Sequence, residues 1–255
     1  MNDRDLIDAN GIVNLVEFLE EHPTMTGGIC NLMGGDKIYE SPENAFMAVP
    51  YLGSHPTGIV FNMDEYRLLG NRECLFNKEA AYIHPHDLIL GRLAQYGEMF
   101  QFNKIWSLAE TDSFAKNKSF LYKQGTVDDA WFSPKARTQE FKLFVTDIAA
   151  SSFNKELKRA KVVQVVKRYL FYCTLNYAFF ISDAGQTAHY GIEPMKLTRK
   201  KLFAIMQRFV KESYQILQEN ELGGKERKYK AVLIFYFWEI YFGKPIWDKI
   251  KQFRS

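Results

Sequence analysis

The run His84-Pro85-His86-Asp87 is the densest group of side chains able to do acid–base or metal chemistry. Two histidines one residue apart can hold a metal when both lie on the same side of a β-strand. Pro85 disfavours that arrangement because proline disrupts a central strand, and no glutamate follows at the cupin-type spacing, where Leu90 and Gly91 stand. We therefore predict no metal here, and interpret the run as a turn before a helix over residues 88–99 that Asp87 caps.

The sequence contains no strong motif for nucleotide binding or for a nucleophilic enzyme. The glycine pairs at residues 27–28 and 34–35 lack the Gly-Lys-Ser/Thr ending of a phosphate loop, and no Gly-x-Ser-x-Gly pattern occurs. We therefore name no catalytic residue and no cofactor. The odd number of cysteines, Cys30, Cys74 and Cys173, is typical of buried, reduced thiols in a cytoplasmic protein.

Two groups of cations stand at the starts of predicted helices. Three basic residues lie at the positive end of the dipole of the helix that Thr198 caps, where each costs a few tenths of a kcal/mol. An anion bound at this helix start would offset that cost. The predicted polyanion contacts of both groups are Lys155, Lys158, Arg159, Lys161, Arg199, Lys200 and Lys201. If the two helices pack in parallel, all seven would form one patch, which would contact phosphates with little sequence readout. The alternative is an ordinary solvated helix end.

The net charge of +3 conceals a strong division along the chain. Residues 1–133 hold 10 Lys/Arg against 19 Asp/Glu, whereas residues 134–255 hold 23 against 11. Such an asymmetry indicates a polyanion-binding half, although two halves that attract each other, or a basic surface that serves solubility, would look the same. We predict an acidic α+β module over residues 1–132 and a basic helical module over residues 133–255.

The elements of the first module follow from turn signals and hydrophobic periodicity. An amphipathic helix ends before Pro23, and residues 27–39 are typical of a β-hairpin that turns at residues 34–36. Further strands are expected over residues 58–63 and 100–106. The expected fold class is therefore α+β, with an antiparallel sheet followed by an all-helical region.

The helical region is organised around residues 155–181, whose basic first half gives way to an apolar and aromatic second half. A helix that is apolar all round is buried, so we predict that this second half and the run over residues 231–238 lie in the core. Both runs are too short to cross a membrane. The turn at residues 222–225 has the length of a helix-turn-helix, but the apolar helix after it cannot read bases.

One segment resembles a known family. The sequences Tyr66-Arg67-Leu68-Leu69-Gly70 and Tyr82-Ile83-His84-Pro85-His86-Asp87-Leu88 resemble the middle of PAS sensory domains, where an "RLLG" turn precedes an "IHP-D" helix start. The likeness covers residues 64–88, and His86 departs from the acidic residue common at its position. The resemblance implies a ligand- or signal-sensing α+β domain.

These observations rank three functions. The first is a regulatory or accessory protein whose basic helical module contacts nucleic acid, DNA included, or another polyanion. The second is a protein-interaction or inhibitor module of a mobile element or phage, without enzymatic activity, whose aromatic surface contacts a partner. The third is an enzyme with a site near His84, His86 and Asp87.

Overall fold

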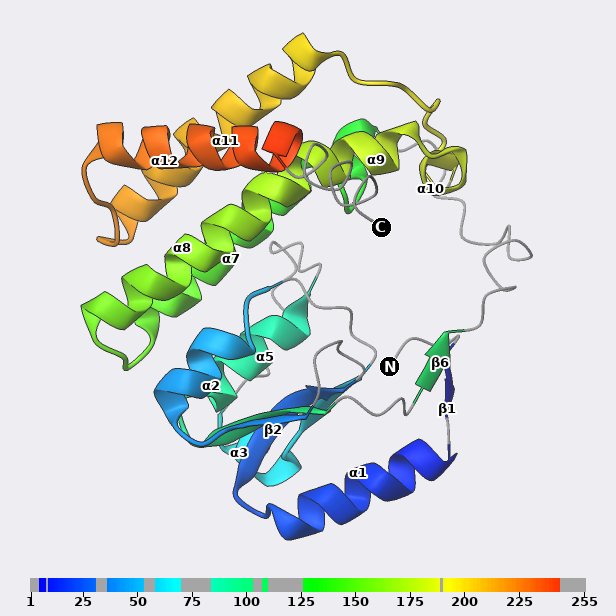
Figure 1. Ribbon diagram of the computed structural model, residues 1–255, viewed down its shortest axis with the longest axis vertical. Helices are drawn as coiled ribbons and strands as arrows, with labels where there is room; N and C mark the ends of the chain where they lie inside the picture. Colours follow the sequence, from blue (N-terminus) through cyan, green and yellow to red (C-terminus); the bar gives the residue numbers. More distant parts are fainter. Residues whose placement is uncertain are drawn as a thin grey trace, which may run out of the picture. The chain divides into compact units, whose positions relative to one another are not determined.

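The computed structural model describes residues 5–7, 9–30, 36–52, 58–69, 84–102, 107–109, 126–188 and 190–243. The chain forms two compact units, many of whose elements are labelled in Figure 1: Met1–Ser119 with Ala150–Lys161, and Phe120–Ala149 with Val162–Ser255. The described residues are α+β in the first unit and helical in the second, which confirms the predicted fold class. Helix α8 (Lys155–Phe171) begins in the first unit and continues into the second. The predicted module boundary at residues 132–133 stays a prediction.

The first unit contains a four-stranded sheet in the order β3-β5-β2-β4. Its strands are β2 (Met25–Cys30), β3 (Lys37–Tyr39), β4 (Ile59–Phe61) and β5 (Glu98–Phe102). The sheet is mixed and not wholly antiparallel, because β2 and β5 run parallel while the other two pairs are antiparallel. A separate antiparallel pair joins β1 (Asp5–Ile7) to β6 (Ser107–Ala109).

The predicted hairpin over residues 27–39 is wrong, because β5 lies between β2 and β3. Every residue of β2 is buried, whereas β3 is mostly exposed. The apolar strand β5, in which Met99, Phe100 and Phe102 are buried, takes the protected place beside β2. Turn-forming residues indicate where the chain reverses. They carry no information about which strand, β3 or β5, pairs with β2 at the centre of the sheet.

Helices cover both faces of this sheet, as Figure 1 shows. On one face lies α1 (Ala9–Glu21), whose Phe18 ring packs 5.2 Å from Phe100 and 5.0 Å from Phe102, measured between ring centroids. The helices on the other face are α2 (Pro42–Ala48) and α5 (Pro85–Leu93). The short helix α3 (Met63–Leu68) begins at the Asn62 cap, which directly follows β4.

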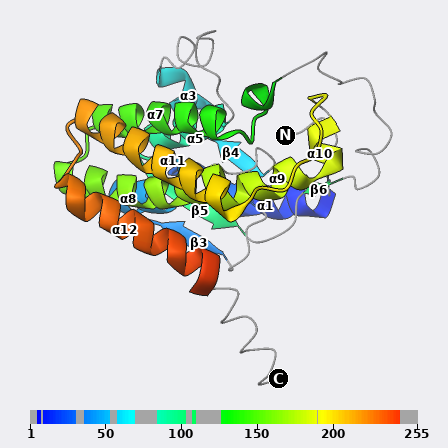
Figure 2. The same ribbon diagram turned by 90° about the horizontal axis from the view of Figure 1, so that it is seen from above.

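The second unit is a group of packed helices. They are α7 (Pro134–Ala150), most of α8, a π-helical turn (Tyr172–Asn176), α9 (Tyr177–Ser182), α10 (Ala184–Ala188), α11 (Arg199–Glu219) and α12 (Glu226–Trp238), which runs on into a second π-helical turn (Glu239–Gly243). Phe141 of α7 joins them, with centroid distances of 5.7 Å to Tyr169 of α8 and 5.6 Å to Phe209 of α11. Figure 2 shows α11 running between α7 and α12.

The prediction of a buried second half for the central run is confirmed for Tyr169, Leu170 and Ile181, which are fully buried, but Phe179 of the same run is 63% exposed. The same prediction for residues 231–238 is wrong. Only Leu233 and Phe237 of that run are buried, and Phe235 is 73% exposed. Helix α12 packs against its neighbours along one side only. Because the run over residues 231–238 is apolar on every side, some of its apolar side chains are left in solvent. None of the helices in the described part of the chain combines the length and low charge that a bilayer crossing needs.

Candidate polyanion-binding surface

Helix α11 begins where the sequence predicts. The Thr198 hydroxyl oxygen accepts a hydrogen bond of 3.3 Å from the backbone N–H of Lys201, which satisfies one of the free N–H groups at the helix start. Arg199, Lys200 and Lys201 are all exposed in the first turn, which contains no acidic residue. The three cations therefore add to the positive end of the helix dipole at the surface.

The basic character continues along α11 beyond the predicted residues. Residues 194–211 contain six cations and no Asp or Glu. These six exposed side chains, which we call the α11 cation strip, are Lys196, Arg199, Lys200, Lys201, Arg208 and Lys211. Lys200 and Lys211 lie eleven residues apart, which places them on the same side of the helix and about 16 Å apart along its axis. The sequence prediction stopped at Lys201 because it weighed only the first helical turn.

One member of the strip has a recorded ion pair within the described part of the chain. The Arg208 Nε donates to the Glu212 carboxylate at 2.8 Å, one helical turn away, and this pairing raises the pKa of Arg208. The Arg208 side chain is nevertheless 79% exposed, so solvent screens the pair and its contribution to stability is small. Glu212 partly offsets the charge of Arg208. The other five cations therefore contribute most of the positive potential of the strip.

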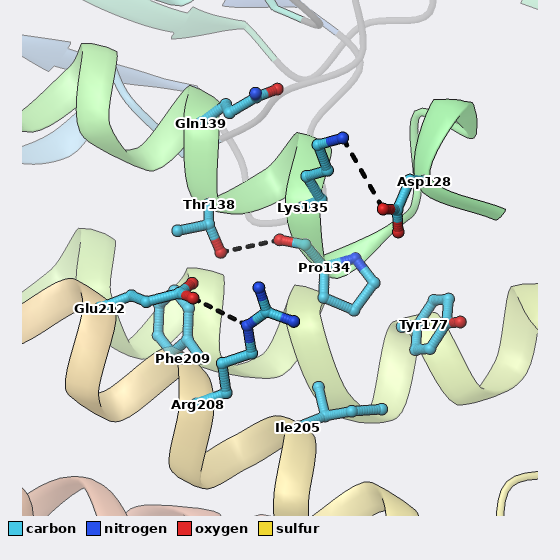
Figure 3. Close-up of a pocket in the computed structure, with 10 residues that line it drawn as sticks. All are labelled: Asp128, Pro134, Lys135, Thr138, Gln139, Tyr177, Ile205, Arg208, Phe209 and Glu212. Carbon is cyan, nitrogen blue, oxygen red and sulfur yellow. Dashed lines mark hydrogen bonds and ion pairs between the residues drawn. The ribbon is translucent and has the colours of Figure 1, made fainter. Parts of the chain in front are cut away.

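A pocket of about 330 Å³ lies beside the strip within the second unit (Figure 3). Its walls come from the Asp128 turn, α7, α9 and α11, with Pro134, Tyr177 and Phe209 among the apolar lining residues. Figure 3 shows the terminal nitrogens of Arg208 pointing toward Pro134, on the side away from Glu212. The Nζ of Lys135 lies 3.7 Å from the Asp128 carboxylate. Because both cations have acidic neighbours, the pocket itself has no excess of positive charge.

Beneath this surface lies a buried polar network that sequence reasoning missed. Arg137 Nη1 donates to Glu140 Oε2 at 3.1 Å, and the Tyr169 hydroxyl donates to the same oxygen at 2.6 Å. The Arg137 guanidinium also lies 4.8 Å from the ring centroid of Trp131 and 4.6 Å from that of Tyr172. These side chains are buried, apart from the half-buried Trp131, so they hold α7 against α8 and do not form a binding surface.

The second predicted cation group lies in the first unit. Lys155 and Arg159 are exposed and Lys158 is half-buried, but Lys161 is fully buried and its Nζ donates to the Met47 carbonyl oxygen at 3.0 Å. Burial lowers the pKa of Lys161 to about 7, and the Asp87 carboxylate acts in the opposite direction. Lys161 is thus not available at the surface. The cations at the start of α8 belong to the first unit and those at the start of α11 belong to the second. That the two groups share one patch therefore stays a prediction.

The histidine run occupies the start of α5. The helix begins at Pro85, with His84 as its N-cap residue and Asp87 already in the first turn, so the predicted cap at Asp87 is wrong. Proline is favoured at the first helical position because its φ angle is already helical. His84, His86 and Asp87 are buried, and no group of three or more metal-ligating side chains occurs among the described residues. The enzyme hypothesis for this run stays untested.

Two of the three cysteines lie among the described residues. Cys30 and Cys173 are buried free thiols, and burial raises the pKa of each to about 12. Such thiols stay protonated at neutral pH and are poor nucleophiles. Cys74 lies outside the described residues.

No protein-family model matches the chain, and the comparisons with curated proteins and with solved structures also found no match. The PAS resemblance stays a prediction, because residues 70–83 of that segment lie outside the described residues. What the chain does must therefore be inferred from its own residues.

Proposed function

We propose that the chain is a cytoplasmic regulatory or accessory protein whose second unit binds the phosphates of nucleic acid or another polyanion through the α11 cation strip. The observation that supports this function is the run of six exposed cations with no acidic residue among them. A surface that served solubility alone would suit mixed charges of both signs.

The physical basis is electrostatic and independent of base sequence. Each lysine or arginine that neutralises a phosphate releases a condensed counterion, so affinity falls as salt rises, with a log–log slope of about −0.9 per contact on duplex DNA. The free N–H groups at the start of α11 favour an anion at the same end of the strip. Recognition by such contacts orients the protein on the backbone and gives little discrimination between sequences.

The test is the salt dependence of binding to labelled duplex DNA, followed by fluorescence anisotropy. We expect the triple variant Arg199→Ala, Lys200→Ala and Lys201→Ala to weaken binding to every sequence about equally and to flatten the slope by about two to three, since each lost phosphate contact removes roughly one. Circular dichroism checks that the variant keeps its fold.

A matched control removes three cations that already have acidic partners. Lys135, Lys142 and Lys230 pair with Asp128, Glu219 and Glu226, so their joint replacement by Ala changes the net charge equally but should leave the slope nearly unchanged. If the unaltered protein fails to bind in low salt, or if both triple variants behave alike, the α11 cation strip is an ordinary solvated helix face.

A second candidate function is a protein-interaction or inhibitor module of a mobile element or phage, without enzymatic activity. The exposed apolar side chains of α12 favour it, since large exposed apolar patches mark interaction sites. A protein complex that survives high salt would support this candidate, whereas the phosphate contacts proposed for α11 would weaken under the same conditions.

A further inference from the structure

One side of α12 exposes large apolar side chains between two opposite charges. Val232 is 53% exposed, Phe235 73% and Trp238 43%, whereas Leu233 and Phe237 on the opposite side are buried. Lys228 and Glu239, also exposed, lie at the two ends of the same side. We call this side the α12 outer face and define it by five residues: Lys228, Val232, Phe235, Trp238 and Glu239.

The spacing of these residues is that of a helix-pairing seam. Lys228, Val232, Phe235 and Glu239 follow one another at intervals of four, three and four residues, which keeps them on one face of a helix. Lys228 and Glu239 stand eleven residues apart, or about 16 Å along the axis, which exceeds the Debye length of about 8 Å at physiological ionic strength. The two charges therefore hardly interact within one chain.

The face is complementary to itself when a second copy runs antiparallel. If Lys228 faces the partner's Glu239, a step of four residues forward in one copy and backward in the other brings Val232 opposite the partner's Phe235. The two-fold axis then repeats both contacts, as an isologous interface requires. We propose that two copies of this chain pair antiparallel through the α12 outer face, with an apolar centre and a Lys228–Glu239 ion pair at each end.

Other occupants of the face fit these observations less well. The phosphates of a polyanion have no favourable contact with Val232, Phe235 and Trp238, and the Glu239 carboxylate would repel them. An unrelated protein would need its own matching order of acid, apolar and basic side chains, which a second copy already has. One helix face is smaller than the roughly 800 Å² per partner of a standard interface, so we expect a dimer that dissociates in the micromolar range.

The test is the molar mass of the full chain in solution, measured by sedimentation equilibrium over a range of protein concentrations. We expect the mass to rise from 29.7 kDa toward twice that value. The variant Phe235→Glu should weaken the dimer at least tenfold, because it places two carboxylates at the apolar centre. Phe179→Glu is the matched control, since Phe179 is a similarly exposed aromatic residue of the same unit, at 63%, but lies on α9.

Charge reversal tests the antiparallel register. Lys228→Glu alone and Glu239→Lys alone should each weaken the dimer several-fold, because the two-fold axis turns both ion pairs into like-charge contacts. The double variant Lys228→Glu/Glu239→Lys should restore it, and its recovery cannot arise within one chain because the two residues are too far apart. Circular dichroism of each variant confirms that the helices remain folded.

Three results would overturn the proposal. A monomer at every concentration would leave the face to a different protein. A dimer unaffected by Phe235→Glu would place the interface elsewhere. A dimer that the double charge reversal fails to restore would exclude the antiparallel register.

Discussion

The buried amine of Lys161 makes a sharp prediction about how stability depends on pH. Its pKa is about 7 in the folded chain, against 10.5 for an ordinary lysine, because burial disfavours the charged form more than Asp87 favours it. Between these two values the unfolded chain binds a proton that the folded chain does not bind. The free energy of unfolding must therefore rise with pH in this window.

The rise in the free energy of unfolding depends on the width of the pH range in which the Lys161 amine is protonated in the unfolded chain but not in the folded chain. One pH unit at full protonation difference is worth about 1.4 kcal/mol. From pH 7, where the folded amine is half-protonated, to pH 9 the increase is about 2 kcal/mol. Above pH 9 the thiols of Cys30 and Cys173 act in the opposite direction, since their folded pKa of about 12 exceeds the ordinary value of 9.0. The contribution of Lys161 levels off only well below its folded pKa, where the amine is protonated in both the folded and the unfolded chain.

The assay compares the unaltered chain with Lys161→Met by urea unfolding, followed by circular dichroism from pH 6 to pH 9. Methionine keeps the unbranched shape without a charge, and loss of the hydrogen bond to the Met47 carbonyl costs about 1–3 kcal/mol at every pH. The difference between the two proteins cancels the titrating groups that do not interact with Lys161 and should change by about 2 kcal/mol in favour of the unaltered chain as pH rises from 7 to 9. A difference that stays constant would refute a buried Lys161 with a lowered pKa.

Two further variants, one in each unit, test the packing by urea unfolding. Glu140→Gln removes the buried charge opposite Arg137 and should destabilise the second unit by about 3–5 kcal/mol, whereas Lys142→Ala removes an exposed pair with Glu219 and should cost under about 1 kcal/mol. Gly28→Ala would place a Cβ atom 2.5 Å from the Phe100 ring and 2.6 Å from its carbonyl oxygen, so we expect a loss of about 1–3 kcal/mol or more. A neutral effect of either Glu140→Gln or Gly28→Ala would contradict the packing described above.

The α+β class and the start of α11 could be predicted because local signals decide them. Thr198 is a good cap wherever the helix docks, and its side chain makes the expected hydrogen bond. The order of the sheet could not be predicted in the same way. Whether β3 or β5 pairs with β2 depends on which strand best fills the centre, and that competition involves residues more than sixty positions apart.

The two buried charges were missed although the sequence contains a signal for each. Arg137 precedes the buried Phe141 by four residues and Phe144 by seven, which places it on the apolar side of α7. Lys161 precedes Val165 by four and so lies on the buried side of α8. Helical position, and not residue type, therefore separates Lys161 from the exposed Lys155 and Arg159 at the start of the same helix.

For helix α12 the error is the reverse. Its apolar residue types predicted burial, but the position of these residues on the helix leaves several of them exposed. Its tertiary contacts, such as the hydrogen bond between the Ser213 and Tyr229 hydroxyls and the Lys167 ammonium 5.2 Å from the Tyr236 ring, occupy the side that α11 and α8 cover. A run apolar on every side has no periodicity to tell which side that is. The uncovered side then requires a physical explanation, because water disfavours it.

The two surfaces proposed for the second unit share no residue and respond differently to salt. Phosphate contacts along α11 weaken steeply as salt rises, through counterion release. Pairing through α12 has an apolar centre formed by Val232 and Phe235, and the hydrophobic effect is not screened. Only its two terminal ion pairs lose strength in salt. Polyanion binding should therefore disappear at a salt concentration at which the dimer persists, so each surface can be studied while the other is unchanged.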